Sequence, residues 1–377
     1  MTFKNIYADK KVFVTGHTGF KGSWLCEWLL KLNAKITGFS LDIPTKPSHF
    51  ELTGLGARIE RDIRGDIREF KKVNEAITAC NPDFIFHLAA QPIVRMAFIK
   101  PLDTVLTNFI GTLNVLEAIR CLEKECIAIM ITTDKVYENK EWYHSYREPD
   151  ELGGIDPYSA SKVCAEAIIS SYFRSFFRDG LLNSRKPCKA VTSVRAGNVI
   201  GGGDWALDRI VPDCIRNLTN NECIPIRNKF SSRPWQHVLE PLSGYLLLGS
   251  QLYSIMNSCV NNDSQERLIN VCSPFNFGPA LSSNRTVIEL VQEMLKHWPG
   301  KWIDQNDPNA PHEAGKLNLA VDKAFHILGW QPNWRFERTI KETVDWYYNA
   351  VKNKFNSESI RAFTQKQIDD YSSTISY

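Results

Sequence analysis

Short apolar runs alternate with amphipathic segments along the first two hundred residues. The apolar runs are rich in strand-forming residues, and they lie at 34–40, 83–90, 127–133 and 190–200. The amphipathic segments carry apolar residues at helical spacing, and they lie at about 68–80, 103–123 and 157–178. Repeated alternation of strand and helix is typical of an α/β fold with a doubly wound parallel sheet. In such a sheet, ligands bind at the carboxyl ends of the strands.

The first strand and helix meet at a glycine-rich turn within "KKVFVTGHTGFKGSWLCEWLLKLNAKITGFSLD", residues 10–42. Residues 12–14 predict a strand buried on both faces, and apolar residues return at helical spacing after the turn. Gly16, Gly19 and Gly22 lack the Cβ atoms that would keep a pyrophosphate from the positive amino end of the helix. A tight turn without any ligand would use the same glycines, so this spacing leaves both interpretations open.

Beyond residue 200 the pattern loosens into loops rich in Gly, Asp, Pro and Trp, with shorter helices at 286–297 and 336–351. This change predicts two parts and a tail. We expect a nucleotide-binding domain over 1–185, with the strand at 190–200 returning to it, a smaller C-terminal substrate-binding lobe mainly over 201–352, and a polar, loosely held C-terminal tail at 353–377.

Composition narrows the class of protein. The chain has 377 residues, 43% of them hydrophobic, which is enough for a large core. Its 45 basic and 42 acidic side chains are interspersed, so we expect no nucleic-acid partner. No long apolar run or signal-peptide core is visible, which predicts a cytoplasmic protein with no membrane partner. The ten cysteines form no C-x-x-C pair, which indicates reduced core thiols and no metal site.

The clearest chemical signal is "DPYSASKVCAEAII", residues 156–169. Asp156 is a good N-cap and Pro157 a good first helical residue, so a helix should begin here. Tyr158 and Lys162 then share one helical face. A cation beside a phenol lowers its pKa from about 10, and such a tyrosine can take a proton from an alcohol. An incidental surface pair on an amphipathic helix would have the same spacing.

Several motifs occur together and in order, which favours the functional interpretation. They are "TGHTGFKG", "GDI" at 65–67, "HLAAQ" at 87–91, "TNFIGTLNVLEA" at 107–118, "TTDKVYE" at 132–138 and "YSASK" at 158–162. With these motifs the sequence resembles the extended short-chain dehydrogenase/reductase family over about residues 10–350. The resemblance implies a Rossmann-type fold and a nicotinamide dinucleotide cofactor.

The resemblance also implies which residues hold that cofactor. They are Gly16, Gly19, Phe20, Lys21, Gly22, Ser40, Asp66, Ile67, Leu88, Ala89, Ala90 and Asn108, together with the catalytic pair Tyr158 and Lys162. The second strand departs from the family pattern, because Ser40 stands where a carboxylate usually binds the ribose hydroxyls. No arginine or lysine replaces that carboxylate, so NAD is expected rather than NADP.

Within this family, "GHTGFKGSWL", "TTDKVYENKEW", "RAGNVIGGGDWALDRIVPD" and "RPWQHVLEPLSGYL" resemble the CDP-glucose 4,6-dehydratases. These enzymes use NAD to form CDP-4-dehydro-6-deoxy-D-glucose and water. By implication Thr133 and Tyr158 act at the sugar 4-hydroxyl, and Asp134 is the acid of the elimination. Lys135 is either the base that removes the carbon 5 proton or a residue that only orients its ligands.

The same resemblance implies substrate contacts, which are Gln91, Asn198, Arg209, Arg233 and His237. Arg233 is the expected diphosphate ligand, since a guanidinium can bind two phosphate oxygens at once. His237 could instead be a core residue.

Alternatives remain open from the sequence. The protein could be a nucleotide-sugar epimerase or reductase, a dehydratase for another nucleotide sugar, or a non-catalytic NAD-binding sensor. The intact Thr133, Tyr158 and Lys162 count against the sensor. Family members often form homodimers or homotetramers through the helix that carries Tyr158 and its neighbour at 103–123. We therefore expect a homo-oligomer.

Overall fold

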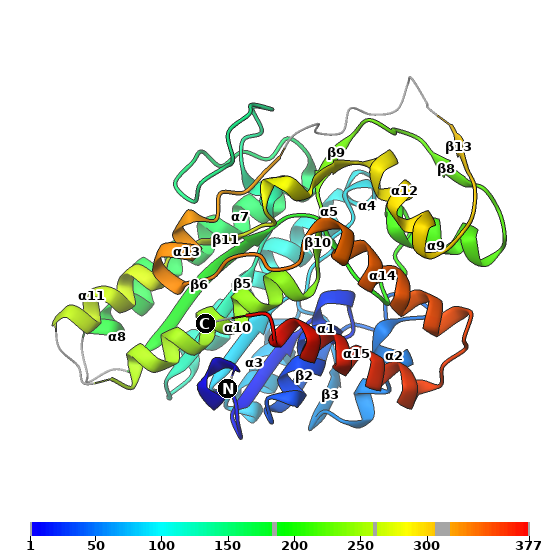
Figure 1. Ribbon diagram of the computed structural model, residues 1–377. Helices are drawn as coiled ribbons and strands as arrows, with labels where there is room; N and C mark the ends of the chain where they lie inside the picture. Colours follow the sequence, from blue (N-terminus) through cyan, green and yellow to red (C-terminus); the bar gives the residue numbers. More distant parts are fainter. Residues whose placement is uncertain (1, 183–186, 259–261, 306–316, 376–377) are drawn as a thin grey trace.

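A computed structural model describes residues 2–182, 187–258, 262–305 and 317–375. Seven parallel strands form one sheet in the order β11-β6-β5-β4-β1-β2-β3 (Figure 1). Helices cover both of its faces, as expected for crossovers between parallel strands. This is the doubly wound Rossmann-type sheet that the sequence predicts, and that prediction is confirmed.

The main sheet contains β1 (Lys11–Thr15), β2 (Lys35–Ser40), β3 (Arg61–Arg64), β4 (Phe84–His87), β5 (Cys126–Ile131), β6 (Lys189–Ala196) and β11 (Phe275–Phe277). The remaining strands form three small pairs, and they are β7 (Val199–Ile200), β8 (Ile224–Ile226), β9 (Ser232–Pro234), β10 (Gln236–His237), β12 (Asn284–Thr286) and β13 (Trp302–Asp304).

The helices before residue 183 are η1 (Thr2–Asn5), α1 (Phe20–Lys31), α2 (His49–Leu52), η2 (Leu55–Ala57), α3 (Phe70–Cys80), α4 (Val94–Ile99), α5 (Pro101–Val105), η3 (Leu106–Ile110), α6 (Gly111–Cys121), η4 (Asp134–Val136), α7 (Pro157–Tyr172), η5 (Phe173–Phe177) and α8 (Arg178–Leu182). The later helices are α9 (Ile210–Thr219), α10 (Leu239–Met256), α11 (Asn262–Val271), η6 (Leu281–Ser283), α12 (Val287–His297), α13 (Asp322–Leu328), α14 (Phe336–Val351) and α15 (Ser357–Ser372). No helix in the described part of the chain is both long and apolar enough to cross a membrane.

Side-chain alternation along the strands divides the core into two layers. On β1, Val12 and Val14 face one layer with Trp24 of α1, while Phe13 faces the other with Val73 of α3 and Val115 of α6. Both sides of the strand are fully buried. This burial explains why the strand is apolar at successive positions rather than at alternate ones.

Elements on both sides of residue 200 contribute to the main sheet and its cover. The segment 190–200 forms two strands, and only β6 joins the main sheet. Downstream, α10 packs on the sheet and β11 pairs with β6, although both fall in the range 201–352 expected for the lobe. Figure 1 shows α9, β8, α12 and β13 gathered beyond one end of the sheet. The expected boundary at residue 185 lies outside the described residues.

The C-terminal segment is a docked helix rather than the loose polar tail expected at 353–377. Helix α15 packs against α1, α2 and α14 (Figure 1). Ile360 and Tyr371 are fully buried, and the ring of Tyr371 packs edge-on against Trp28 of α1 at 5.7 Å between centroids. The prediction failed because most residues of α15 are polar, and only a narrow stripe of the helix is apolar.

One buried carboxylate fastens this helix. Glu240 of α10 accepts hydrogen bonds from the backbone N–H of Asn333 at 3.0 Å, from that of Trp334 at 2.6 Å and from the Tyr371 hydroxyl at 2.8 Å. Burial raises the pKa of Glu240 to about 7, although these hydrogen bonds favour the charged form.

We expect this carboxyl group to make stability depend on pH. Its pKa is about 7 in the folded chain and about 4.5 when exposed, so between these values the folded state binds the additional proton. The free energy of unfolding should therefore fall by about 3 kcal/mol, relative to a Glu240→Gln variant, as the pH rises from 4 to 8. Denaturant titrations across this range measure the difference. Glu337→Gln, at an exposed position, is the control, and parallel curves for wild type and Glu240→Gln would contradict the expectation.

Candidate active site

Most of the residues expected to bind the cofactor follow the carboxyl ends of adjacent strands. Strand β1 lies between β4 and β2, and β5 lies beside β4. The glycine turn follows β1, Ser40 ends β2, Leu88–Ala90 follow β4, and Thr133 follows β5. Parallel pairing brings these ends to one edge of the sheet, so residues far apart in sequence share one site.

The three glycines have different tasks. Gly16 has φ +74°, and a Cβ there would lie 2.7 Å from the backbone nitrogen of Ala89. A Cβ on Gly22 would overlap the carbonyl oxygen of Gly16. Both glycines are therefore needed to close the turn. A Cβ on Gly19 would meet only the Gly16 oxygen, at 3.3 Å, so Gly19 leaves open space before the amino end of α1. This space and the helix dipole fit a pyrophosphate.

The other residues expected at the cofactor lie around this turn in varied surroundings. Ser40 is buried, and its hydroxyl has no hydrogen-bond partner. Asp66 accepts bonds from Arg68, which lowers the pKa of its carboxyl group. Ile67 is buried and packs against Gly111 of α6. An unpartnered buried hydroxyl beside an open turn fits a ligand with polar groups.

Asn108 connects the loop after β4 to the helix that carries Tyr158. Its Oδ1 accepts a hydrogen bond from the backbone N–H of Gln91 at 2.8 Å, and its Nδ2 donates to Oγ of Ser161 at 2.9 Å. The side chain of Gln91 in turn bonds Ile93 and Thr104 within the same region. Both side chains therefore shape this loop.

Helix α7 begins as the sequence predicts. The Asp156 carboxylate accepts hydrogen bonds from the backbone N–H groups of Tyr158 and Ser159, at 2.9 and 3.0 Å. Tyr158 and Lys162 are both buried. The Lys162 Nζ donates to the carbonyl oxygen of Ile131, the last residue of β5, at 3.3 Å. The cap therefore fixes the start of the helix, and the lysine ties the helix to the neighbouring strand.

The phenol of Tyr158 is not acidified in the way the sequence suggests. Burial raises its pKa to about 12, a hydrogen bond with Thr133 lowers it, Asp134 raises it, and Arg209 lowers it. Lys162 is not among these largest influences, and burial lowers its own pKa to about 8. Desolvation is therefore the largest influence on the pKa of both groups.

Asp134 lies beside the tyrosine. Its side chain is only 4% exposed, and its Oδ1 accepts a hydrogen bond from Thr133 Oγ1 at 3.0 Å. The adjoining glycine makes room for it, because a Cβ on Gly197 would lie 2.9 Å from Asp134 Oδ2. Lys135 Nζ is 3.8 Å from Asp134 Oδ1, and its side chain is 34% exposed. A buried carboxyl group and a more accessible amine therefore adjoin Thr133 and Tyr158.

Arg209 immediately precedes α9 and is held by residues that the sequence analysis missed. Its Nη1 is 2.7 Å from Asp204 Oδ2, and the backbone oxygen of Asp204 accepts a hydrogen bond from Tyr347 of α14. The charge of Arg209 lowers the pKa of both Tyr158 and Lys21, which places it near the catalytic helix. Asp204 lies in the quoted "GGGDW" motif, but no local signal indicates its partners.

The remaining expected substrate residues differ in accessibility. Arg233 of β9 is partly buried and donates to the carbonyl oxygen of Ser232 at 2.8 Å, and Asn198 lies between β6 and β7. His237 is fully buried between the rings of Trp24 and Trp334, and this burial lowers its pKa to about 3. His237 is therefore a core residue, and the expected substrate contact is not supported.

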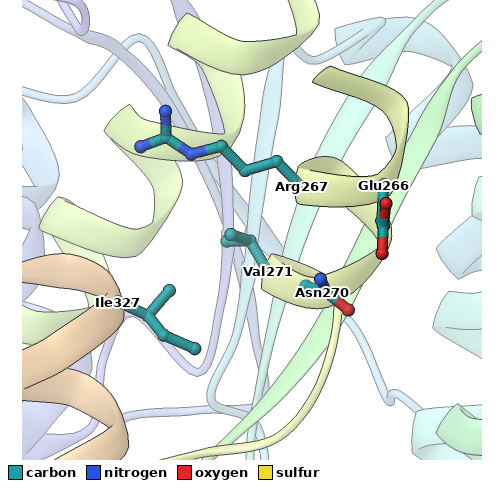
Figure 2. Close-up of a pocket in the computed structure, with 5 residues that line it drawn as sticks. All are labelled: Glu266, Arg267, Asn270, Val271 and Ile327. Carbon is teal, nitrogen blue, oxygen red and sulfur yellow. The ribbon is translucent and has the colours of Figure 1, made fainter. Parts of the chain in front are cut away.

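A surface hollow lies away from this edge. Figure 2 shows its lining on α11 and α13, which consists of Glu266, Arg267, Asn270, Val271 and Ile327. Helix α11 ends shortly before β11 begins, so the hollow lies near the amino end of that strand. The expected cofactor and catalytic residues follow the carboxyl ends of the strands, on the opposite side of the sheet from this hollow.

Two features define the class of protein. They are a glycine turn that fits a dinucleotide and a buried Tyr-Lys pair on the helix after β5. The fold and site are those of an extended short-chain dehydrogenase/reductase, as the sequence resemblance implies.

Comparisons with known proteins give a narrower assignment. The family model described as GDP-mannose 4,6 dehydratase matches residues 13–343. CDP-glucose 4,6-dehydratase from Salmonella typhimurium is 42% identical over 375 residues, which cover 99% of each chain. CDP-paratose 2-epimerase from Salmonella typhi is 31% identical over 360 residues, which cover 89% of this chain and 98% of the relative.

A solved structure of dTDP-glucose 4,6-dehydratase from Bacillus anthracis in complex with NAD aligns with a TM-score of 0.68. It is 19% identical, and the alignment covers 91% of this chain and 97% of that one. This likeness shows the shared fold. From the family model and the two relatives, the chain belongs to the nucleotide-sugar 4,6-dehydratase family described as GDP-mannose 4,6 dehydratase.

We expect the glycines to respond differently to an added methyl group. Gly19→Ala should weaken NAD binding by about tenfold or more, since a loss of 1.4 kcal/mol has that effect, while the melting temperature stays unchanged. Gly22→Ala should lower the melting temperature as well, because its Cβ overlaps the turn itself. Titration calorimetry with NAD and thermal unfolding measure the two effects. Unchanged NAD affinity in Gly19→Ala would show that the pyrophosphate lies elsewhere.

Proposed function

We propose that this protein is an NAD-dependent hydro-lyase that converts CDP-D-glucose into CDP-4-dehydro-6-deoxy-D-glucose and water. The observation that carries the proposal is the position of Asp134. This buried carboxyl group contacts Thr133 and acts electrostatically on Tyr158. Elimination of water requires an acid next to the site of alcohol oxidation, whereas epimerisation at carbon 4 requires none.

The cofactor would be held by the glycine turn, Phe20, Lys21, the loop at Leu88–Ala90 and the catalytic helix. When bound, NAD supplies chemistry that no side chain offers, since it accepts a hydride from carbon 4 of the sugar and later returns it to carbon 6. The amino end of α1 would neutralise part of the pyrophosphate charge. Lys162 would bind the nicotinamide ribose and stabilise the Tyr158 phenolate.

In the first half of the reaction, Tyr158 takes the proton of the sugar 4-hydroxyl. Thr133 hydrogen-bonds to the same oxygen and to the phenol, and so fixes the direction of proton transfer. The phenol has to be acidic for this role, although burial holds its pKa at about 12 without ligands. Thr133 and Arg209 lower that pKa, and both face the substrate in this assignment.

The 4-ketone then acidifies the proton on carbon 5. Lys135 removes that proton, and Asp134 donates a proton to the departing 6-hydroxyl, which leaves as water. The double bond between carbons 5 and 6 would then receive at carbon 6 the hydride that the cofactor took from carbon 4, and at carbon 5 the proton that Lys135 removed. Lys135 Nζ and Asp134 Oδ1 are 3.8 Å apart, so both groups lie within reach of one small sugar.

The lobe would bind the nucleotide part of the substrate. We assign Arg233 to the diphosphate, because a guanidinium binds two phosphate oxygens in one plane. Arg209 supplies a second positive charge close to Tyr158. Asn198 follows β6 at the same edge of the sheet. Two relatives support cytidine as the nucleoside of the substrate, because both are named for a CDP-sugar.

We also propose a cytoplasmic homo-oligomer, either a dimer or a tetramer. Helices α6 and α7 pack side by side, and the continuation of α7 exposes Phe176 at 52%. Apolar residues at such a face favour association with a second copy.

The substrate assignment is tested with CDP-glucose, dTDP-glucose, UDP-glucose and GDP-mannose, each incubated separately with catalytic NAD. We expect the 4-keto-6-deoxy product, detected by mass spectrometry as loss of water, from CDP-glucose alone. Turnover of one of the other nucleotide sugars instead would assign a different nucleobase to the substrate. Epimerised sugar without loss of water, or stoichiometric accumulation of NADH, would replace the dehydratase by an epimerase or a reductase.

The role of Lys135 is tested with Lys135→Met. Loss of the base should slow both water loss and deuterium exchange at carbon 5 by about a hundredfold or more, while NADH absorbance still appears. Asp134→Asn should instead retain that exchange and slow only the elimination. Lys140→Met, at an exposed lysine five residues along the chain, is the control. Elimination at a near-normal rate in Lys135→Met would leave Lys135 with an orienting role.

A further inference from the structure

One turn beyond Lys162, helix α7 carries a second buried ionisable group. Glu166 is 4% exposed, and four hydrogen bonds reach its two oxygens. Oε1 accepts from Thr132 Oγ1 at 2.5 Å and from Arg195 Nε at 2.9 Å. Oε2 accepts from Ser193 Oγ at 2.7 Å and from Arg195 Nη2 at 3.1 Å. The carboxylate therefore joins α7 to β6 and to the residue that follows β5.

The guanidinium of Arg195 is equally buried and continues the network. Its Nη1 donates to the Tyr137 hydroxyl at 2.8 Å and to the backbone oxygen of Glu148 at 3.0 Å. Opposite charges in this bidentate geometry keep each other ionised inside the protein. Burial opposes the charge on Glu166, but the charge and hydrogen bonds of Arg195 lower its pKa below the usual range.

Lys162 gains from this carboxylate. Burial lowers the pKa of Lys162 to about 8, and the charge of Glu166 is the influence that raises it. The other ionisable groups on the elements packed around Lys162 are Lys21 of α1, His87 of β4, Asp134 of η4, Tyr158 of its own helix and Arg195 of β6 behind Glu166. Burial keeps His87 neutral, with its pKa near 3. The charge of Asp134 acts on Lys21 and Tyr158, and Glu166 is the negative charge that raises the pKa of Lys162.

We propose that Glu166 is a positioning residue that keeps Lys162 in its ammonium form beside Tyr158. Its bond to Thr132 at the same time anchors the catalytic helix to the chain that leads into Thr133. The inference rests on the proposed function only for the use made of Lys162. The charge relation between the two side chains exists without substrate or cofactor.

A purely structural role of Glu166 predicts a different response of Lys162 to substitution. If Glu166 only holds strands and helix together, then any loss of its hydrogen bonds should have similar consequences. If its charge matters, neutralising the carboxylate should affect Lys162, and removing one uncharged donor should not. Glu166→Gln removes the charge with little change of shape. Ser193→Ala removes one hydrogen bond to the same carboxylate and no charge.

The direct measurement is the pH titration of the Lys162 side chain by ¹³C NMR in the full chain without ligands. Lysine labelled at Cε is used, and the signal is assigned by its absence in Lys162→Met. We expect Glu166→Gln to move the titration downward by about one pH unit, and Ser193→Ala to leave it in place. If Glu166→Gln does not fold, Glu166→Gln/Arg195→Met removes both buried charges and should give a smaller downward shift, because the positive charge of Arg195 is lost together with the negative charge of Glu166.

An unchanged Lys162 titration in the Glu166 variants, or equal shifts in Ser193→Ala, would overturn the inference. The pH profile of NADH formation from CDP-glucose is the second measurement. Its alkaline limb should move to lower pH in Glu166→Gln, so that the rate above pH 8 falls about tenfold, because the ammonium form is lost earlier. A shifted NMR titration in a protein that dehydrates none of the sugars would contradict the proposed function and leave the role of Glu166 standing.

Discussion

The pairing of β1, β4 and β5 in parallel is the constraint on which the rest of the site depends. Backbone hydrogen bonds between these strands fix the separation of their carboxyl ends. The glycine turn, the loop after β4 and the Thr133–Lys135 segment all begin at those ends. These three segments are far apart in sequence, and only the pairing of the strands brings them together. A shift of one residue in the register would move every side chain to the other face of the sheet.

Packing at the edge that this pairing creates is so close that several positions have no room for a side chain. Gly16 lies against the backbone of Ala89, and Gly197 leaves space for the Asp134 carboxylate. Gly202 packs against the ring of Trp346, and its carbonyl oxygen accepts a hydrogen bond from Trp24. Through these contacts the loop that carries Asp204 and Arg209 is seated on α1 and α14. The lobe and the sheet therefore share one core behind the site.

Local patterns predict the parts of this arrangement that local interactions decide. The strand and glycine turn, the Asp156 cap and the helix at 336–351 follow from residues close together in sequence. Strand β11 has three residues and gains its place from pairing with β6, and α15 has too narrow an apolar stripe to be recognised.

The same limit applies to the site. The buried position of His237 depends on Trp24 and Trp334, which come from distant segments. The pairing of Arg209 with Asp204 depends on Tyr347 in the same way. A motif can indicate that a side chain matters, but packing between remote elements decides whether it faces a ligand or the core. The electrostatics follow the same rule, because burial outweighs neighbouring charges at Tyr158.

Helix α15 also connects a distant part of the chain to the helix that follows the glycine turn. It packs on α1, and the ring of Tyr371 lies against Trp28 of that helix. Local unfolding of α15 would therefore uncover Trp28 and remove support from α1, so backbone hydrogen exchange near the glycine turn is coupled to the opening of a helix remote in sequence.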